Sequence, residues 1–306
     1  MEINTLLMIL FMSIQSKNSI NSFNYFIIQS ISSLMLIMLL IIKNNLLNNY
    51  LMDSFILMTF SMKLGLFPFF IWMPMINSHL NWILIFFMST TQKLIPLLIL
   101  NLTFNFNNKE NIMWFIYLMV IFSSMTASIM SIKELNLKKI LTYSSINHSS
   151  WMLFIISIDQ SMFYLYFMFY SCSMMFFCFM LNKFNINKIN DLIKLNLFNH
   201  KFINISMSLN ILILSALPPF LTFMIKMNAM KIILFNNHYF MIIMFAILSI
   251  FTVIFYMMIL IKMNFIFLIK NKIWMHPFKL NNNFFSIILT FLLTLNIMFL
   301  LFQMLN

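Results

Sequence analysis

The sequence contains no arginine, a single glycine, two cysteines and few charges of either sign. Charged residues make up 8% of the 306 residues and apolar residues 62%, whereas soluble domains carry about 25% and about 45–50%. Such a composition cannot cover a water-facing surface, which excludes a soluble globular protein and favours a lipid bilayer as the solvent. Because each crossing takes about 30 residues with its loop, the length accommodates about ten membrane spans.

The missing arginine and scarce cysteine exclude several kinds of site. All basic residues are lysines scattered between apolar runs, so the net charge of +12 does not describe a nucleic-acid-binding face. Cys172 and Cys178 lie six residues apart in one apolar run, where a helix separates them, and are expected to be free packing thiols. The chain has no glycine-rich phosphate loop and no cysteine set, so we expect no catalytic, cofactor-binding or metal site on it.

The abundant residues indicate where the gene lies. Phe (39) and Met (33) are very frequent while Gly (1) and Pro (6) are rare, which is the pattern of an extremely AT-rich genome. So many methionines are expected if AUA also encodes Met, as it does in animal mitochondria. The N-terminus lacks the pattern of an imported precursor or a secretory signal, so we expect an organelle-encoded protein.

Apolar runs separated by breaks bearing Asn and Lys predict an all-α, multispanning membrane protein. The runs are continuous and do not alternate as the strands of a membrane barrel do. The first run is short for a crossing, and the eighth is long enough for one helix broken at a proline pair. The ten predicted spans are residues 3–15, 25–42, 51–75, 82–104, 112–131, 138–157, 161–181, 203–235, 239–263 and 284–304.

The lysines of the loops predict an orientation. Loops after odd-numbered spans hold eleven lysines, and loops after even-numbered spans hold three, Lys43, Lys109 and Lys231. By the positive-inside rule the lysine-rich loops lie on the side of synthesis, so both termini are expected on the opposite side.

Three lysines, Lys63, Lys93 and Lys226, lie deep inside predicted spans. A lysine at the bilayer centre costs about 2.5–3.5 kcal/mol on insertion scales, so three of them favour a function. The alternative is snorkelling to the interface, which fits Lys231 and Lys262 near run ends. A proline accompanies each central lysine, and because proline frees helix carbonyls we expect broken helices along a polar path, although proline kinks are also common in ordinary membrane helices. These prolines are Pro68 and Pro74, Pro96, and the pair Pro218-Pro219.

The span from 138 to 157 is the most polar of the ten. At helical spacing Ser144 shares a face with His148, and Tyr143 shares one with Asn147, so these side chains could form a proton-conducting row. The alternative is that they only hydrogen-bond neighbouring helices. A single histidine near mid-membrane excludes a haem bundle, which needs paired axial histidines. Glu2, directly before the first run, would by itself be an ordinary interfacial residue.

Four strings, in order and spacing, resemble the chain 2 family of antiporter-like subunits in mitochondrial NADH:ubiquinone oxidoreductase, respiratory complex I. They are MKLGLFPFFIWMP at 62–74, TTQKLIPLLI at 90–99, LKKILTYSSINHSSWM at 137–152 and ALPPFLTFMIK at 216–226. The resemblance implies a single transmembrane domain of inverted repeats, each with one broken helix: a first repeat over 1–104, a second over 112–263 and a C-terminal helix over 284–304.

The resemblance also implies site residues. Lys63 corresponds to the lysine of the first broken helix, Lys93 to the central lysine and Lys226 to the lysine of the second broken helix. The opening MEINTLL resembles the segment with the essential glutamate, so Glu2 is assigned to the relay and is expected below the membrane surface, pointing at Lys63 directly or through one water. Pro68, Pro218 and Pro219 would mark the helix breaks.

The implied function is proton translocation through a mid-membrane Lys/Glu/His relay, as a subunit of the H⁺-translocating NADH:ubiquinone reductase in the mitochondrial inner membrane. FMN, iron–sulfur clusters and ubiquinone are expected in partner subunits. The expected partners are an adjacent antiporter-like subunit, small core membrane subunits, accessory subunits and membrane lipids.

The chain departs from the family pattern at several positions. Phe70 and Met75 stand where the family usually has His and Glu, so these two positions cannot conduct protons, and Ser150 and Thr222 replace glycines. Animal members usually have one more helix before the glutamate. Either the gene product begins upstream of Met1 or this lineage has lost that helix.

Two other functions remain open. One is a stand-alone cation/proton antiporter, which usually has a carboxylate ion site, whereas Glu2 is the only acidic residue expected within a span. The other is a structural membrane-arm subunit without its own proton path, against which the retention of all three lysines argues.

Overall fold

The computed structural model describes residues 1–15, 20–45, 49–104, 110–192, 201–218, 220–235 and 239–268. These residues are almost entirely helical, which confirms the all-α prediction. The chain forms two compact units. The first comprises Met1–Glu134 and Lys138–Phe163, and the second comprises Leu135–Leu137 and Tyr164–Asn306, so the boundary falls inside one long helix.

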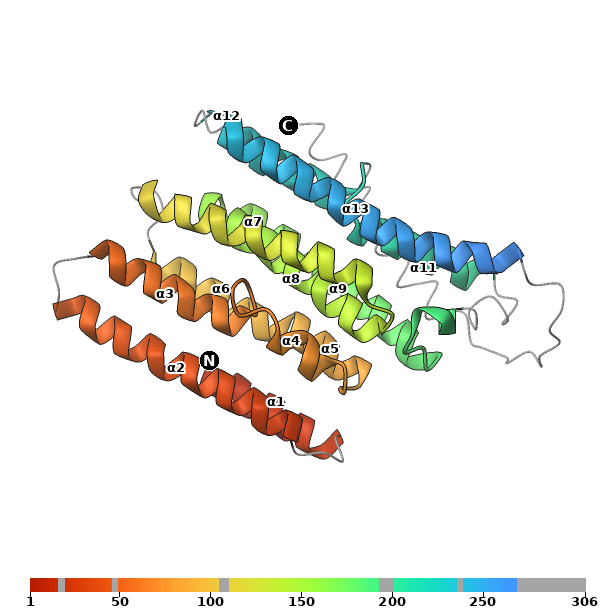
Figure 1. The fold of residues 1–306 in the computed structure, drawn as a ribbon, viewed down its shortest axis with the longest axis horizontal. Coiled ribbons are helices and arrows are strands. Elements are labelled where there is room, and N and C mark those ends of the chain that lie inside the picture. The colour runs from red at the N-terminus through yellow and green to blue at the C-terminus, as the bar shows by residue number, and fades with distance from the viewer. Residues whose placement is uncertain are drawn as a thin grey trace. The chain divides into compact units, whose positions relative to one another are not determined.

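The first unit contains eight helices in its described part (Figure 1). Four of them each correspond to one predicted apolar run, and the runs 51–75 and 82–104 are each divided between two helices. They are α1 (Glu2–Gln15), α2 (Ile20–Asn45), α3 (Asn49–Leu64), α4 (Trp72–Asn77), α5 (Trp82–Ser89), α6 (Thr91–Thr103), α7 (Glu110–Lys133) and α8 (Leu137–Ile158).

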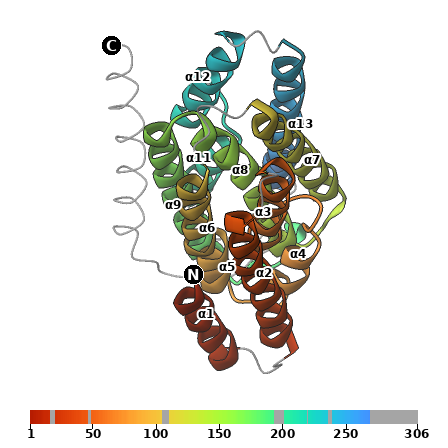
Figure 2. The same ribbon diagram turned by 90° about the vertical axis from the view of Figure 1, so that its left-hand side faces the viewer.

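Helix α3 lies at the centre of this unit. It packs along α2 over most of its length and also contacts α6 and α7, while α1 packs against α2 and α5 (Figure 2). Its buried apolar side chains include Ile56, Phe60 and Leu64. Serine hydroxyls inside the bundle donate to the carbonyl three residues earlier, as Ser123 does to Val120, so these buried hydroxyls are hydrogen-bonded within their own helix.

The second unit contains most of α9 (Gln160–Lys183), the short 3₁₀ helix η2 (Ile189–Leu192), α11 (Lys201–Leu214), α12 (Leu221–Phe235) and α13 (Tyr239–Leu268). Both α11 and α12 pack on α13, the longest helix of this unit (Figure 1).

The third predicted span is interrupted between α3 and α4, around Pro68. The only glycine of the chain, Gly65, ends α3 in the left-handed conformation with φ +67°. The N–H of Leu66 donates to the carbonyl of Ser61 at 2.9 Å, which is the hydrogen bond of a Schellman cap. The next two freed carbonyls also have donors: Trp72 Nε1 donates to Met62 at 3.2 Å, and Gln29 Nε2 donates to Lys63 at 3.4 Å. The break therefore satisfies its own backbone inside the bundle.

The eighth predicted span is interrupted in the same way, between α11 and α12. Ala216 adopts a left-handed conformation with φ 53°, and Pro218 follows. Thr222 Oγ1 donates to the carbonyl of Ile213 at 3.1 Å and so caps the end of α11. Two interrupted helices were predicted, and both are present; Pro219 itself lies outside the described residues.

Five helical segments of the described chain are long and apolar enough to cross a membrane: Ile20–Lys43, Trp82–Thr103, Ile112–Lys133, Gln160–Lys183 and Tyr239–Met263. The other predicted spans fall short for physical reasons. The breaks divide two of them into halves of at most 16 residues, α1 has 14 residues, and α8 is long enough but polar. The tenth span, 284–304, lies outside the described residues, and the inverted-repeat boundaries remain a prediction.

Candidate functional site

The three lysines singled out from the sequence are buried. Lys63, Lys93 and Lys226 have 6%, 2% and 3% of their surface exposed, and no other lysine is buried among the side chains that the structure describes. Lys231 and Lys262, expected to snorkel from run ends, are exposed. The lysines predicted to lie deep inside spans are thus buried, and those predicted to lie near run ends are exposed.

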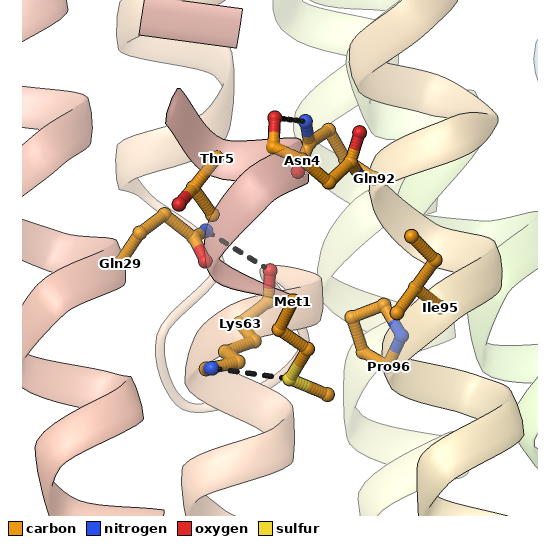
Figure 3. A pocket seen from close by; sticks show the side chains of 8 residues that line it. All are labelled: Met1, Asn4, Thr5, Gln29, Lys63, Gln92, Ile95 and Pro96. Atoms are coloured by element: carbon orange, nitrogen blue, oxygen red, sulfur yellow. Dashed lines mark hydrogen bonds between the residues drawn. The ribbon is translucent and has the colours of Figure 1, made fainter. Parts of the chain in front are cut away.

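Lys63 lies in the last turn of α3 and borders a small pocket between α1, α2, α3 and α6 (Figure 3). The pocket has about 10 Å³ in which the centre of a water molecule can lie, which is room for about one water. Its lining combines polar and apolar side chains and consists of Met1, Asn4, Thr5, Gln29, Lys63, Gln92, Ile95 and Pro96. The ammonium of Lys63 contacts Met1 Sδ at 3.2 Å, and a thioether is only a weak acceptor.

Helix α6 lines the same pocket with Gln92, Ile95 and Pro96. Pro96 lies inside α6 and cannot donate to the carbonyl of Gln92, four residues earlier. The side chain of Gln92 donates to the carbonyl of Asn4 at 3.1 Å, which connects α6 to the start of α1 (Figure 3). A water in this pocket would thus have polar partners from several helices.

Glu2 is exposed at the start of α1 and forms no ion pair with Lys63 within 4.0 Å in the described structure. Its carboxylate is nevertheless near enough to interact electrostatically with Lys63 and with the buried Tyr25. A direct contact with Lys63 is therefore not present, and the predicted contact through one water remains a prediction.

Lys93 lies directly after an irregular turn that separates α5 from α6. Thr90 has φ −114° and ψ −77°, so the fourth span bends there, a feature the sequence analysis did not predict. The ammonium of Lys93 donates three hydrogen bonds, all to α8: to the carbonyl of Ser145 at 2.6 Å, to Ser145 Oγ at 3.0 Å and to Ser149 Oγ at 3.2 Å. A lysine has three donors, and here each has an oxygen acceptor.

The polar side chains of α8 from Thr142 to Ser150 are buried on every face of the helix. Tyr143, Ser144, Asn147 and His148, the predicted row, are all buried. The face that meets Lys93, however, carries Ser145 and Ser149 rather than that row. Helical periodicity predicts which residues share a face of α8, but the sequence does not predict which face packs against α6. The roles of the predicted row remain a prediction.

Lys226 belongs to the second unit and lies near the start of α12, after the break at Pro218. The predicted position of His148 between Lys93 and Lys226 remains a prediction.

One buried carboxylate contradicts the expectation that Glu2 is the only acidic residue within a span. Asp53, in α3, has no exposed surface and pairs with Lys43 of α2 at 2.6 Å. The ammonium of Lys43 also lies 5.4 Å from the ring centroid of Phe104, at the end of α6. Asp53 was overlooked because it lies only two residues after the start of its run. The signal in the sequence was Lys43, at the other side of the same short loop.

Among the described residues no three His, Cys, Asp or Glu side chains come together as a metal site would require.

Residues 1–252 match the family described as NADH:quinone oxidoreductase/Mrp antiporter, TM. The chain is 30% identical to NADH-ubiquinone oxidoreductase chain 2 of Anopheles gambiae, over 95% of this chain and 85% of that protein. It is 29% identical to the chain 2 proteins of Aedes aegypti and Locusta migratoria, covering 64% and 82% of their lengths and 75% and 92% of its own.

The fold is similar to that of chains in three solved membrane complexes. Respiratory complex I from Thermus thermophilus with bound aureothin gives a TM-score of 0.75 at 16% identity, over 92% of this chain and 67% of that one. An archaeal membrane-bound sulfane sulfur reductase gives 0.74 at 15% identity, over 95% and 65%. The Mrp complex from Dietzia sp. gives 0.65 at 12% identity, over 79% and 50%. At these identities the likeness concerns the fold.

Proposed function

The chain belongs to the NADH:quinone oxidoreductase/Mrp antiporter transmembrane family, and we propose that it is an antiporter-like membrane-arm subunit of respiratory complex I that translocates protons. The relatives named above are subunits of NADH-ubiquinone oxidoreductase in animals. The proposed location is therefore the mitochondrial inner membrane, with the gene on the organelle genome.

The proposed partners follow from this membership. They are an adjacent antiporter-like subunit, small core membrane subunits, accessory subunits and lipids. FMN, iron–sulfur clusters and ubiquinone belong to partner subunits, where NADH oxidation and quinone reduction take place. This chain contributes to the enzyme as a proton path and performs no redox step.

The observation that carries the proposal is the burial of Lys63, Lys93 and Lys226 inside apolar helices. An ammonium at this depth is costly and is retained in membrane proteins mainly along ion and proton paths. Two of the three lysines adjoin interrupted helices, where freed backbone groups can take up water, and Lys63 also borders a pocket with room for about one water.

At the Lys63 end, the pocket lined by Lys63 and Gln92 supplies a place for one water. Glu2 is the carboxylate of this end. A carboxylate near an ammonium favours the charged forms of both, so a movement of α1 that changes their separation changes how firmly Lys63 holds its proton. Quinone reduction in the partner subunits would drive that movement.

From Lys63 the proposed path continues to Lys93, then through His148 on α8, and on to Lys226. Tyr143, Ser144 and Asn147 would support water and hydroxyl contacts beside His148. Their burial within the first unit favours this role over a lipid-facing one.

A stand-alone cation/proton antiporter is the second candidate, because the matching family also includes Mrp antiporters and because Asp53 provides a buried carboxylate. Asp53 is paired with Lys43 near the loop end of α2 and α3, about 15 Å along α3 from Lys63 by helical rise. An ion site would have to displace that lysine.

The test is proton pumping by the assembled complex in sealed liposomes, with Lys63→Met beside Lys231→Met as the control. Both changes remove one lysine charge, but Lys231 is exposed. We expect Lys63→Met to lower the number of protons moved per NADH oxidised and Lys231→Met to leave it unchanged. Equal pumping by both variants would favour a structural subunit, and sodium-driven proton movement without NADH would favour the antiporter.

A further inference from the structure

The acceptors around Lys93 all come from two residues of α8. Ser145 provides its carbonyl and its hydroxyl, and Ser149 provides its hydroxyl, at 2.6, 3.0 and 3.2 Å from Nζ. Lys93, Ser145 and Ser149 are all buried, so bulk water does not compete for these hydrogen bonds. The arrangement satisfies a protonated lysine fully with protein oxygens alone.

Each serine hydroxyl also has a place for its own hydrogen. Ser145 Oγ donates to the carbonyl of Thr142 at 2.8 Å, and Ser149 Oγ donates to the carbonyl of Ile146 at 2.9 Å. A hydroxyl has one donor and two acceptor sites and can rotate about its C–O bond. Both serines therefore accept from Lys93 while donating to the helix backbone.

The same two hydroxyls suit the neutral amine. When Nζ gives its proton to a water molecule, the electron pair of the broken N–H bond stays on nitrogen, which becomes an acceptor. A serine hydroxyl can then rotate away from its backbone carbonyl and donate to that lone pair, while the two remaining N–H groups keep their oxygen acceptors. No buried polar group is left unsatisfied in either state, which removes a penalty that a buried lysine would otherwise carry.

We propose that Ser145 and Ser149 are positioning residues for proton transfer at Lys93, accepting from its ammonium and donating to its amine by rotation of their hydroxyls. This inference rests on the proposed function, since it matters only if Lys93 exchanges protons. It adds to the relay two residues on a face of α8 different from that of Ser144 and His148.

The chain offers a matched control on the same helix. Ser150 is also buried and donates to the carbonyl three residues earlier, that of Asn147, at 2.7 Å. It is not one of the acceptors of the Lys93 ammonium, which are Ser145 and Ser149. Ser150→Ala therefore removes a comparable hydroxyl from α8 without changing the surroundings of Nζ.

The experiment measures proton pumping against pH in the assembled complex in liposomes, with uncoupled NADH oxidation as the readout of assembly. The variants are Ser149→Ala, Ser145→Ala/Ser149→Ala, Ser149→Thr, Ser150→Ala and Lys93→Met. Losing an acceptor weakens the hold on the ammonium more than on the amine, so we expect the pH profile of Ser149→Ala to move about one unit to lower pH, a tenfold change. The double variant should lose pumping further, while Ser149→Thr, which keeps a hydroxyl, restores the original profile.

A Ser149→Ala profile identical to that of Ser150→Ala would overturn the positioning role, provided that Lys93→Met still lowers pumping; the proposed relay would then stand without the serines. If Lys93→Met pumps normally, the proposed function fails instead. Should Ser149→Ala prevent assembly, Ser149→Thr decides: an unshifted profile supports the hydroxyl's role, and a shifted profile overturns it.

Discussion

At the scale of single residues, the two partners of the ion pair between Lys43 and Asp53 differ in how far they are exposed to solvent. Asp53 is completely buried, whereas about a fifth of the Lys43 side chain is exposed. A buried charge that loses its partner destabilises a protein by about 3–5 kcal/mol, but a charge that can reach water is affected less. The consequence of breaking the pair should therefore depend on which residue is removed.

We expect Lys43→Met to be more damaging than Asp53→Asn. The first change leaves a buried carboxylate without its lysine and should destabilise the subunit by about 3 kcal/mol, while the second leaves a lysine that can extend toward the interface. The amount and thermal stability of the assembled complex would show this order. The reverse order, or equal effects, would mean that the pair does not stabilise the α2–α3 end.

The sequence predicts the buried lysines well and their partners poorly. Lys63, Lys93 and Lys226 stand out because of the cost of a charge in an apolar run, a property of each residue alone. Ser145 and Ser149 do not stand out, because α8 carries hydroxyls on every face and only the packing of α6 against α8 selects one. Asp53 was missed for the same reason: its burial depends on Lys43 in another helix.

At the scale of helices, the break after α3 depends on the one glycine. The left-handed conformation of Gly65 costs about 1–2 kcal/mol for a residue with a Cβ atom. An added Cβ would also lie 3.2 Å from Met73 Sδ and 3.3 Å from Met73 Cβ. Gly65→Ala should therefore destabilise the fold by about 2 kcal/mol and lower the melting temperature of the complex.

The break before α12 offers the opposite test. Ala216 has φ 53°, so a glycine there would relieve about 1 kcal/mol of backbone strain. Ala216→Gly should leave the thermal stability of the complex unchanged or raise it, measured beside Gly65→Ala. A loss comparable to that of Gly65→Ala would show that the side chain of Ala216 contributes more than its conformation costs.

The two main helix breaks could be predicted because proline marks them in the sequence. The bend at Thr90 could not, since the run from 82 to 104 has no breaker before Lys93. The hydroxyls of Thr90 and Thr91, which donate to the carbonyls of Phe86 and Phe87, stabilise this turn locally. Threonine does so in straight helices as well, so its presence alone does not predict a bend.

At the scale of the whole molecule, the helices confirm the predicted all-α membrane fold, while the direction in which they cross remains a prediction. The lysine count of the loops places Lys188, after α9, in the matrix and Gln160, at the start of α9, on the intermembrane side. Both residues are exposed. Because one helix connects them, their sides are opposite whenever α9 crosses the membrane.

A membrane-impermeant thiol reagent can test this orientation. Lys188→Cys should react in inside-out inner-membrane particles and Gln160→Cys in right-side-out mitoplasts, with Cys172 and Cys178 protected inside the span. Reaction of each cysteine only from the other side would reverse the topology and leave the fold intact.

The central claim is that this chain conducts protons during NADH oxidation, and the most direct measurement is the number of protons moved per NADH oxidised by a complex carrying Lys93→Met. Lys93 is the least exposed of the three lysines, and methionine is an unbranched side chain, one heavy atom shorter, that lacks the exchangeable proton. The proposed relay predicts a lower ratio, with the complex assembled and NADH oxidation retained in the presence of an uncoupler. An unchanged ratio would contradict it.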